Sequence, residues 1–173
     1  MTDAVNIVQL PLLEINRFEG LSLTDLNPIE HNAVIRLALD IMKNRYARGK
    51  KIESIDDAIR YLQLLYGEKD REIFSVVLCD NHHRVIEIEE LFLGTIDGAS
   101  VYPREVVKAA LMHNAAAVLL VHNHPSGIAE PSKADKVITD RLCKAFSLVD
   151  VRVLDHIIVT FESSVSFAQR GLM

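Results

Sequence analysis

Apolar residues recur at helical spacing in two segments near the amino end of the chain. Asn27, Pro28 and Glu30 form a capping signal for the first segment, which continues to about residue 46. The second segment starts at Ser54 and runs to Gly67, a residue type that commonly follows a helix. The pattern therefore predicts two helices ahead of the rest of the chain.

Beyond these segments the apolar positions form short continuous runs, which are typical of buried strands. Polar turns and further helical segments separate the runs. The pattern predicts a β-hairpin from residues 73–79 and 84–93, a buried strand over 115–121 and a last strand or hairpin arm over 149–161, with helices over 102–112 and 132–146. Helices that alternate with strands indicate an α/β fold in which helices flank a mixed sheet.

The length of the chain, 173 residues, and its 49% hydrophobic content are those of one enzyme-sized domain. Residues 1–26 mix polar and apolar positions and include Pro11 and Gly20, so we expect an extended arm there. We therefore divide the chain into an N-terminal arm and helix, residues 1–50, and a main domain, residues 51–173.

The net charge of -5 argues against a basic surface for nucleic acid over the whole chain. A local group of cations between Lys43 and Lys51 includes one aromatic residue, Tyr46, and lacks the regular alternation of cations and aromatics that binds single strands. We expect a solvated helix end there, whose cations complement the helix dipole. Direct nucleic-acid binding is thus not favoured.

The two cysteines, Cys79 and Cys143, lie far apart and have no CxxC partner, which indicates neither a disulfide nor a thiolate zinc site. The first 13 residues lack the basic start of a signal peptide, and no apolar run approaches the roughly 18 residues of a membrane span. We expect a cytoplasmic protein without a membrane contact.

Candidate chemistry follows the buried strand predicted over residues 115–121. His122 and His124 are two residues apart, so on a strand their side chains face the same side. Together with Asp135 they form a ligand set that suits zinc. At a catalytic zinc site, three protein ligands leave the fourth coordination position to water. Ser132 and Asp135 also match a helix N-cap with an acid in its first turn, and one helix start can serve both roles.

The whole pattern, His-x-His followed by seven residues, Ser, two residues and Asp, is that of the JAMM signature of the JAB/MPN metalloprotease superfamily. The chain resembles the RadC-like branch more closely, over roughly residues 55–173. The matching stretches, in order, are residues 90–95 (ELFLGT), 103–105 (PRE), 122–127 (HNHPSG), 131–132 (PS), 155–156 (DH) and 166–171 (SFAQRG).

This resemblance implies a three-layer αβα fold of the cytidine deaminase-like type, here preceded by the two predicted helices. It also implies a general-base glutamate at the start of the first core strand, a place that Glu72 occupies. Ser132 would then donate a hydrogen bond to the developing oxyanion. Asp155 and His156 have two possible interpretations: a hydrogen-bonded pair that supports the site, or a core histidine whose polar atoms are satisfied.

The favoured function is a zinc-dependent metallopeptidase or isopeptidase that acts on a peptide or protein substrate. A DNA repair-associated protein is the first alternative, although residues 1–50 lack the paired glycine turns of the DNA-binding segment that RadC-like proteins often carry. A non-catalytic JAB/MPN interaction module is the second. A homodimer that forms by pairing of exposed strand edges is a further alternative.

Overall fold

The computed structural model describes residues 20, 22–94 and 100–173. These residues form a mixed sheet of order β2-β1-β3-β4-β5, four α-helices and a short 3-10 helix. The elements are the 3-10 helix Leu23–Asp25, α1 Pro28–Arg45, α2 Ile55–Tyr66, β1 Ile73–Cys79, β2 Val85–Leu93, α3 Pro103–Met112, β3 Ala117–Asn123, α4 Lys133–Ser147, β4 Arg152–Val159 and β5 Ser164–Ser166. The predicted α/β class and the two preceding helices are confirmed.

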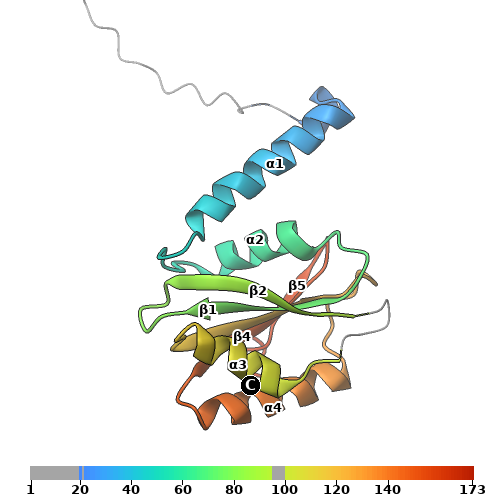
Figure 1. Ribbon diagram of the computed structural model, residues 1–173. Coiled ribbons are helices and arrows are strands. Elements are labelled where there is room, and N and C mark those ends of the chain that lie inside the picture. The colour runs from blue at the N-terminus through green and yellow to red at the C-terminus, as the bar shows by residue number, and fades with distance from the viewer. Residues whose placement is uncertain (1–19, 21, 95–99) are drawn as a thin grey trace, which may run out of the picture. The chain divides into compact units, whose positions relative to one another are not determined.

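Helices cover both faces of the sheet, as the sequence predicts (Figure 1). All residues of β1 and β3 are buried, and successive side chains alternate between the two faces. Leu119 packs with Leu62 of α2, whereas the next residue, Leu120, packs with Phe146 of α4. Two apolar clusters thus lie on opposite sides of the sheet and complete the three-layer αβα arrangement.

The strand directions bring four chain segments to one edge of the sheet. β1 is antiparallel to β3, with Phe74 opposite His122, so the start of β1 lies beside the end of β3. β3 and β4 are parallel and therefore end at the same edge. Since α4 connects them, its first turn also lies there. Polar residues at these four positions are placed close together by topology alone.

Two strand boundaries differ from the predicted ones. β3 extends beyond the apolar run, because His122 and Asn123 still pair with Ile158 and Val159 of β4. The segment predicted as a last strand or hairpin arm forms β4, and the chain then turns back into β5, which pairs antiparallel with β4. β5 has three residues, two of them serines, and so has no apolar pattern that would reveal it.

The chain divides into two compact units, residues 1–34 and 35–173. The arm predicted over residues 1–26 lies mostly outside the described residues. In the first unit, the Asn27 side chain accepts hydrogen bonds from the amides of Ile29 (2.9 Å) and Glu30 (3.1 Å), and so forms the predicted cap of α1. In the second, Tyr46 stacks on Tyr61 of α2, with ring centroids 5.3 Å apart. The division at residue 51 stays a prediction.

Both cysteines are free thiols, as the sequence indicates. Within the described part of the chain, no helix combines the length and the apolar character that crossing a membrane requires.

Asp155 fastens the end of the chain to the sheet. Its carboxylate accepts hydrogen bonds from the Ser166 hydroxyl, from the amide of Ala168 (2.9 Å) and from the amide of His156 (2.7 Å). The residue is 3% exposed, so water cannot replace these bonds. One carboxylate thereby orders β5 and the segment after it.

We predict that Asp155→Ala lowers the free energy of unfolding by about 3 kcal/mol, because it leaves buried donors without acceptors. Asp155→Asn retains one acceptor oxygen and is expected to cost less. Urea unfolding followed by circular dichroism measures both. Asp140→Ala, which removes an exposed acid paired with Lys144, should cost less than about 1 kcal/mol. Equal losses in the Asp155 and Asp140 variants would contradict the anchoring role.

Candidate metal centre

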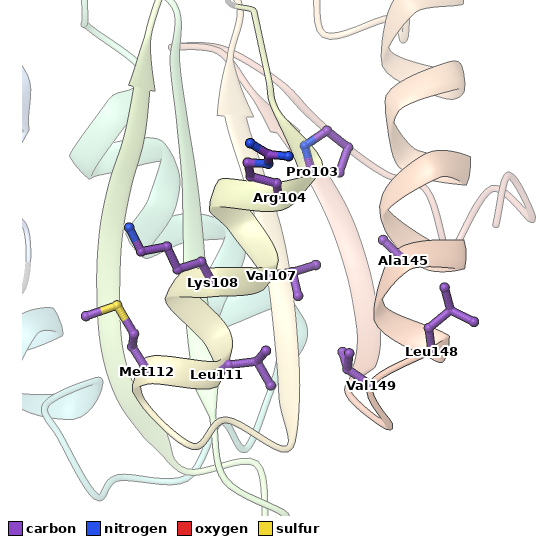
Figure 2. Close-up of a pocket in the computed structure, with 9 residues that line it drawn as sticks. All are labelled: Pro103, Arg104, Val107, Lys108, Leu111, Met112, Ala145, Leu148 and Val149. Atoms are coloured by element: carbon purple, nitrogen blue, oxygen red, sulfur yellow. The ribbon is translucent and has the colours of Figure 1, made fainter.

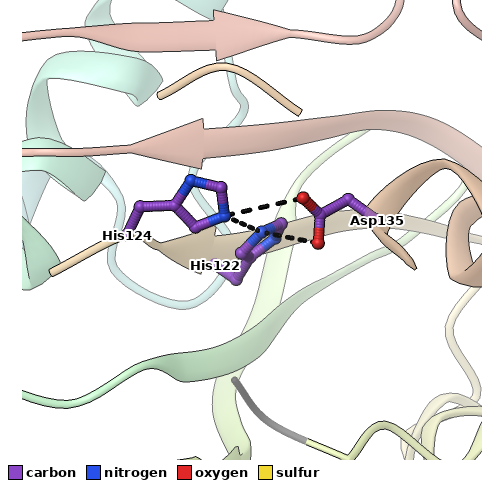
Figure 3. Close-up of side chains that lie close together, drawn as sticks. All are labelled: His122, His124 and Asp135. Carbon is purple, nitrogen blue, oxygen red and sulfur yellow. Dashed lines mark hydrogen bonds and ion pairs between the residues drawn. The ribbon is translucent and has the colours of Figure 1, made fainter. Parts of the chain in front are cut away.

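Three potential metal ligands converge at the edge where β3 ends (Figure 3). The Nε2 atoms of His122 and His124 are 3.0 Å apart. Asp135 places Oδ1 3.4 Å from His122 Nε2 and Oδ2 3.6 Å from His124 Nε2. Two ligands of a tetrahedral zinc ion lie roughly 3.3 Å apart when each bond is about 2.0–2.1 Å. The three separations therefore suit one small ion bound between the side chains.

A tight turn allows the chain to reverse directly after the second histidine. The amide of Gly127 donates to the carbonyl of His124 (3.1 Å), and Pro125 occupies the position that favours such a turn. Gly127 has a φ of 80°, a conformation that residues with a Cβ rarely adopt. The turn starts the return of the chain to the first turn of α4, and this brings Asp135 back to the histidines.

The start of α4 serves two roles at once. Ser132 Oγ accepts a hydrogen bond from the Asp135 amide (3.1 Å), and Asp135 Oδ2 accepts one from the Ser132 amide (2.7 Å). This reciprocal capping box fixes the Asp135 carboxylate relative to the helix. The two interpretations of Asp135, helix cap and metal ligand, are thus compatible in one geometry.

A chain of buried hydrogen bonds determines which nitrogen of His122 faces the centre. The Thr139 hydroxyl donates to the carbonyl of Asp135 (2.6 Å), so its oxygen must accept from His156 Nδ1 (2.6 Å). Neutral His156 then has a lone pair on Nε2, which accepts from His122 Nδ1 (2.8 Å). His122 is left with a lone pair on Nε2, the atom that faces His124 and Asp135.

His124 reaches the same state through a shorter route. Its Nδ1 lies 2.7 Å from the carbonyl oxygen of Ile128, which can only accept a hydrogen bond. The proton is therefore on Nδ1, and Nε2 again carries the lone pair. Two imidazole lone pairs and a carboxylate thus point at one place, an arrangement that suits a bound metal ion.

The electrostatics of the centre follow from burial and mutual contact. Burial opposes ionisation of Asp135, but hydrogen bonds from His122 and His124, which form when their Nε2 atoms bind a proton in place of a metal ion, outweigh it and hold the pKa of this carboxyl well below its usual range. The hydrogen bond with Asp135 raises the pKa of His124, against the effect of burial. Burial, then the charge of His122, lowers the pKa of His156 well below its ordinary value, which keeps that ring neutral.

Glu72 lies directly before β1 and is half-buried. It lines a cavity of about 250 Å³ together with His122 and Asp135, and its charge contributes to the raised pKa of His124. The antiparallel register that pairs Phe74 with His122, continued by two residues, brings Glu72 level with His124. The structure therefore places Glu72 beside the candidate ligands, and its catalytic role stays a prediction.

Asn123 holds the segment that carries Glu72. Its side chain lies on the sheet face opposite to that of His122, where Oδ1 accepts from the Ile73 amide (2.8 Å). Its amide group donates to the carbonyls of Arg71 (3.0 Å) and Lys69 (3.4 Å). Asn123 is 1% exposed, so these bonds are shielded from water. The residue between the two histidines thereby positions the candidate base on the neighbouring strand.

Sequence reasoning did not identify Thr139 or Asn123 as functional residues, and it left His156 open. Thr139 is one helical turn after Asp135, a spacing that could have drawn attention to it. His156 packs between Phe74 and Phe167, with ring centroids 5.7 and 4.8 Å away. It is both a satisfied core histidine and a support for His122, whereas Asp155 points to the end of the chain.

Ser132 has an exposed side chain and acts as the N-cap of α4. In the cap its oxygen accepts a hydrogen bond, a role that leaves the hydroxyl proton to be donated elsewhere. The observed cap is therefore compatible with the expected donation to a developing oxyanion, which stays a prediction.

A second hollow, of about 640 Å³, lies between α3 and α4 (Figure 2). Apolar side chains, among them Leu111, Met112 and Leu148, form much of its wall, and Arg104 and Lys108 lie at its border. The described residues that line it include no carboxylate and no imidazole. We therefore place the candidate chemistry at the His-His-Asp centre alone.

The mixed sheet with helices on both faces and the centre at its edge define the class as an α/β domain of JAB/MPN-like architecture. The model of the RadC-like JAB domain family matches residues 52–172. The chain belongs to this family.

The curated relatives extend the match beyond the family model. The chain is 48% identical over 167 residues to UPF0758 protein Tgr7_0100 of Thioalkalivibrio sulfidiphilus, which covers 96% of this chain and 74% of that protein. It is 54% identical over 142 residues to a UPF0758 protein of Vibrio cholerae, covering 82% and 89%. A UPF0758 protein of Tolumonas auensis is 55% identical over 135 residues, but the match spans 60% of its length. These names state no activity.

We predict that Thr139→Val weakens zinc binding about ten-fold, because His156 loses the acceptor that sets its tautomer and thereby that of His122. Competition with a fluorescent chelator measures the dissociation constant. Thr160→Val is the matched control, since Thr160 is equally buried but bonds to Ser163. The control should lower stability and leave zinc affinity unchanged. Unaltered affinity in folded Thr139→Val would contradict the hydrogen-bond chain.

We predict that Asn123→Ala destabilises the protein by about 2–3 kcal/mol, because three backbone groups lose their partner. Amide hydrogen exchange of Ile73 should accelerate, while zinc remains bound at the centre. Exchange mass spectrometry over residues 69–75 measures this effect. Asn81→Ala, in an exposed turn, serves as the control. Unchanged exchange in this segment would show that Asn123 does not hold it.

Proposed function

We propose that the protein is a zinc-dependent hydrolase of amide bonds, of the metallopeptidase or isopeptidase type. The observation that carries the proposal is the convergence of two imidazole lone pairs and one carboxylate, with the other nitrogen of each ring already engaged. Membership in the RadC-like JAB family supports it, because the wider superfamily includes metalloproteases.

His122, His124 and Asp135 would hold the ion. Two imidazoles and one carboxylate are typical ligands of catalytic zinc, and three protein ligands leave a position open. The same set also occurs around non-haem iron. The identity of the metal is therefore part of the test. When bound, zinc polarises a carbonyl group and lowers the pKa of a water molecule to about 7.

The residues around the ion would supply proton transfer and orientation. Glu72 would accept a proton from the attacking water at its carboxylate and pass it to the departing nitrogen. The Ser132 hydroxyl would donate a hydrogen bond to the carbonyl oxygen as negative charge develops there. His156 and Thr139 would hold His122 in its ligand tautomer, and Asn123 would keep Glu72 in place.

The substrate in this proposal is a peptide or protein amide. We place the reaction in the cytoplasm, because both cysteines are unpaired and the chain relies on no disulfide. A DNA-associated protein stays an alternative, and an interaction module becomes the better hypothesis if the centre takes up no metal.

The first prediction of this proposal is metal content. Elemental analysis for zinc, iron, manganese and nickel should find about one zinc per chain, and His122→Ala and Asp135→Ala should lose it while remaining folded by circular dichroism. Glu72→Gln should keep the metal and lose at least about 100-fold of the hydrolysis rate, because an amide cannot accept the proton. Mass spectrometry of a tryptic peptide library, with and without EDTA, measures the hydrolysis.

Glu68→Gln is the matched control, an exposed glutamate four residues away that should keep both metal and rate. A parent protein that binds no metal after incubation with zinc would overturn the proposal and favour the interaction module. Bound zinc with no EDTA-sensitive cleavage would reject the hydrolase. Iron in place of zinc would change the chemistry that the centre performs.

A further inference from the structure

The cavity beside the metal centre has two chemically different ends. Its acidic end contains Glu72 and Asp135 together with His122. Among the described residues that line it, Arg141 is the one with a permanent positive charge. The cavity, about 250 Å³ in volume, is large enough for one side chain of moderate size. Its polarity gives a bound molecule a preferred direction.

The wall between the two ends is apolar. Ala134 and Ile138 lie on one face of α4, and Val101 and Val137 add to the same apolar surface. Arg141 follows Ile138 on that face of the helix. Arg141 is six residues beyond Asp135, a rise of about 9 Å along the helix. An extended peptide covers that distance in roughly three residues. The dimensions therefore match a short stretch of peptide that runs from the centre to Arg141.

The charge of Arg141 is not used within the described part of the chain. No hydrogen bond or ion pair between described residues engages its guanidinium group. Lys144, one turn further along α4, is by contrast paired with Asp140 at 2.6 Å. A guanidinium beside the apolar wall of a cavity is well suited to bind a carboxylate, with two parallel hydrogen bonds.

We infer that this cavity is a substrate subsite for an apolar side chain flanked by a carboxylate, and that Arg141 selects the carboxylate. The amide to be cleaved must lie at the centre, so the carboxylate of the substrate lies at the other end of the cavity, where the guanidinium group of Arg141 attracts it. This inference rests on the proposed function and narrows its substrates to peptides with an acidic group within about three residues of the cleaved bond.

Peptide hydroxamates test the subsite without turnover, because the hydroxamate chelates zinc. We compare two pairs of labelled compounds. Within each pair, leucine stands next to Glu in one compound and next to Gln in the other. The hydroxamate follows the leucine in the first pair and precedes it in the second, so that both chain directions are sampled. Fluorescence anisotropy with the zinc-loaded protein measures affinity. In at least one pair, the Glu compound should bind about three- to ten-fold more tightly than its Gln partner. Added salt should reduce this preference.

Arg141→Gln should reduce the preference to about one, and Arg141→Lys should retain part of it, because a point charge lacks the paired hydrogen bonds. Lys136→Gln is the matched control, an exposed cation of α4 that does not line the cavity, and it should keep the full preference. Equal binding of Glu and Gln compounds by the parent, or a preference that survives Arg141→Gln, would overturn the subsite. Failure of every hydroxamate to bind the zinc-loaded protein would instead show that the bound zinc has no open coordination position, and would reject the proposed function.

Discussion

A buried polar atom must have a partner, and in this protein that requirement determines where the reactive lone pairs point. Thr139, His156 and His122 are buried in a row, and each donor in the row has one acceptor. Because the Asp135 carbonyl can only accept, the direction of every later bond follows from it. Asp135 therefore has two effects on His122. Its carboxylate faces the ring, and its backbone carbonyl sets the tautomer of the ring through Thr139 and His156.

The remaining parts of the centre depend on strand direction. Because β1 is antiparallel to β3, the Glu72 segment lies beside the end of β3. Because β3 and β4 are parallel neighbours, His156 lies within hydrogen-bonding distance of His122. Asn123 lies on the opposite face of the sheet and holds the segment before β1. Two consecutive residues of β3 therefore have different roles: His122 faces the candidate metal, and Asn123 positions the segment that contains Glu72. A change in register by one residue would exchange their faces and separate both sets of contacts.

Much of this arrangement could be predicted from the sequence. The apolar runs located β1 and β3, the cap signals located the starts of α1, α2 and α4, and the spacing of His122, His124 and Asp135 pointed to a common centre. β5 was missed because three residues with two serines show no period. Thr139 and Asn123 were missed because a single polar residue in a helix or at a strand end has many ordinary explanations.

The sequence by itself determined the alternation of helices and strands, the capped start of α4 and the set of side chains able to bind a metal. These features arise from periodicity and from capping bonds between residues three or four positions apart, which the order of residues reveals directly. Only the tertiary structure decided which nitrogen of His122 is free, because its partner His156 is 34 residues away and Thr139 lies 17 residues before that partner. Contacts at such separations depend on strand order and register, which no local pattern specifies.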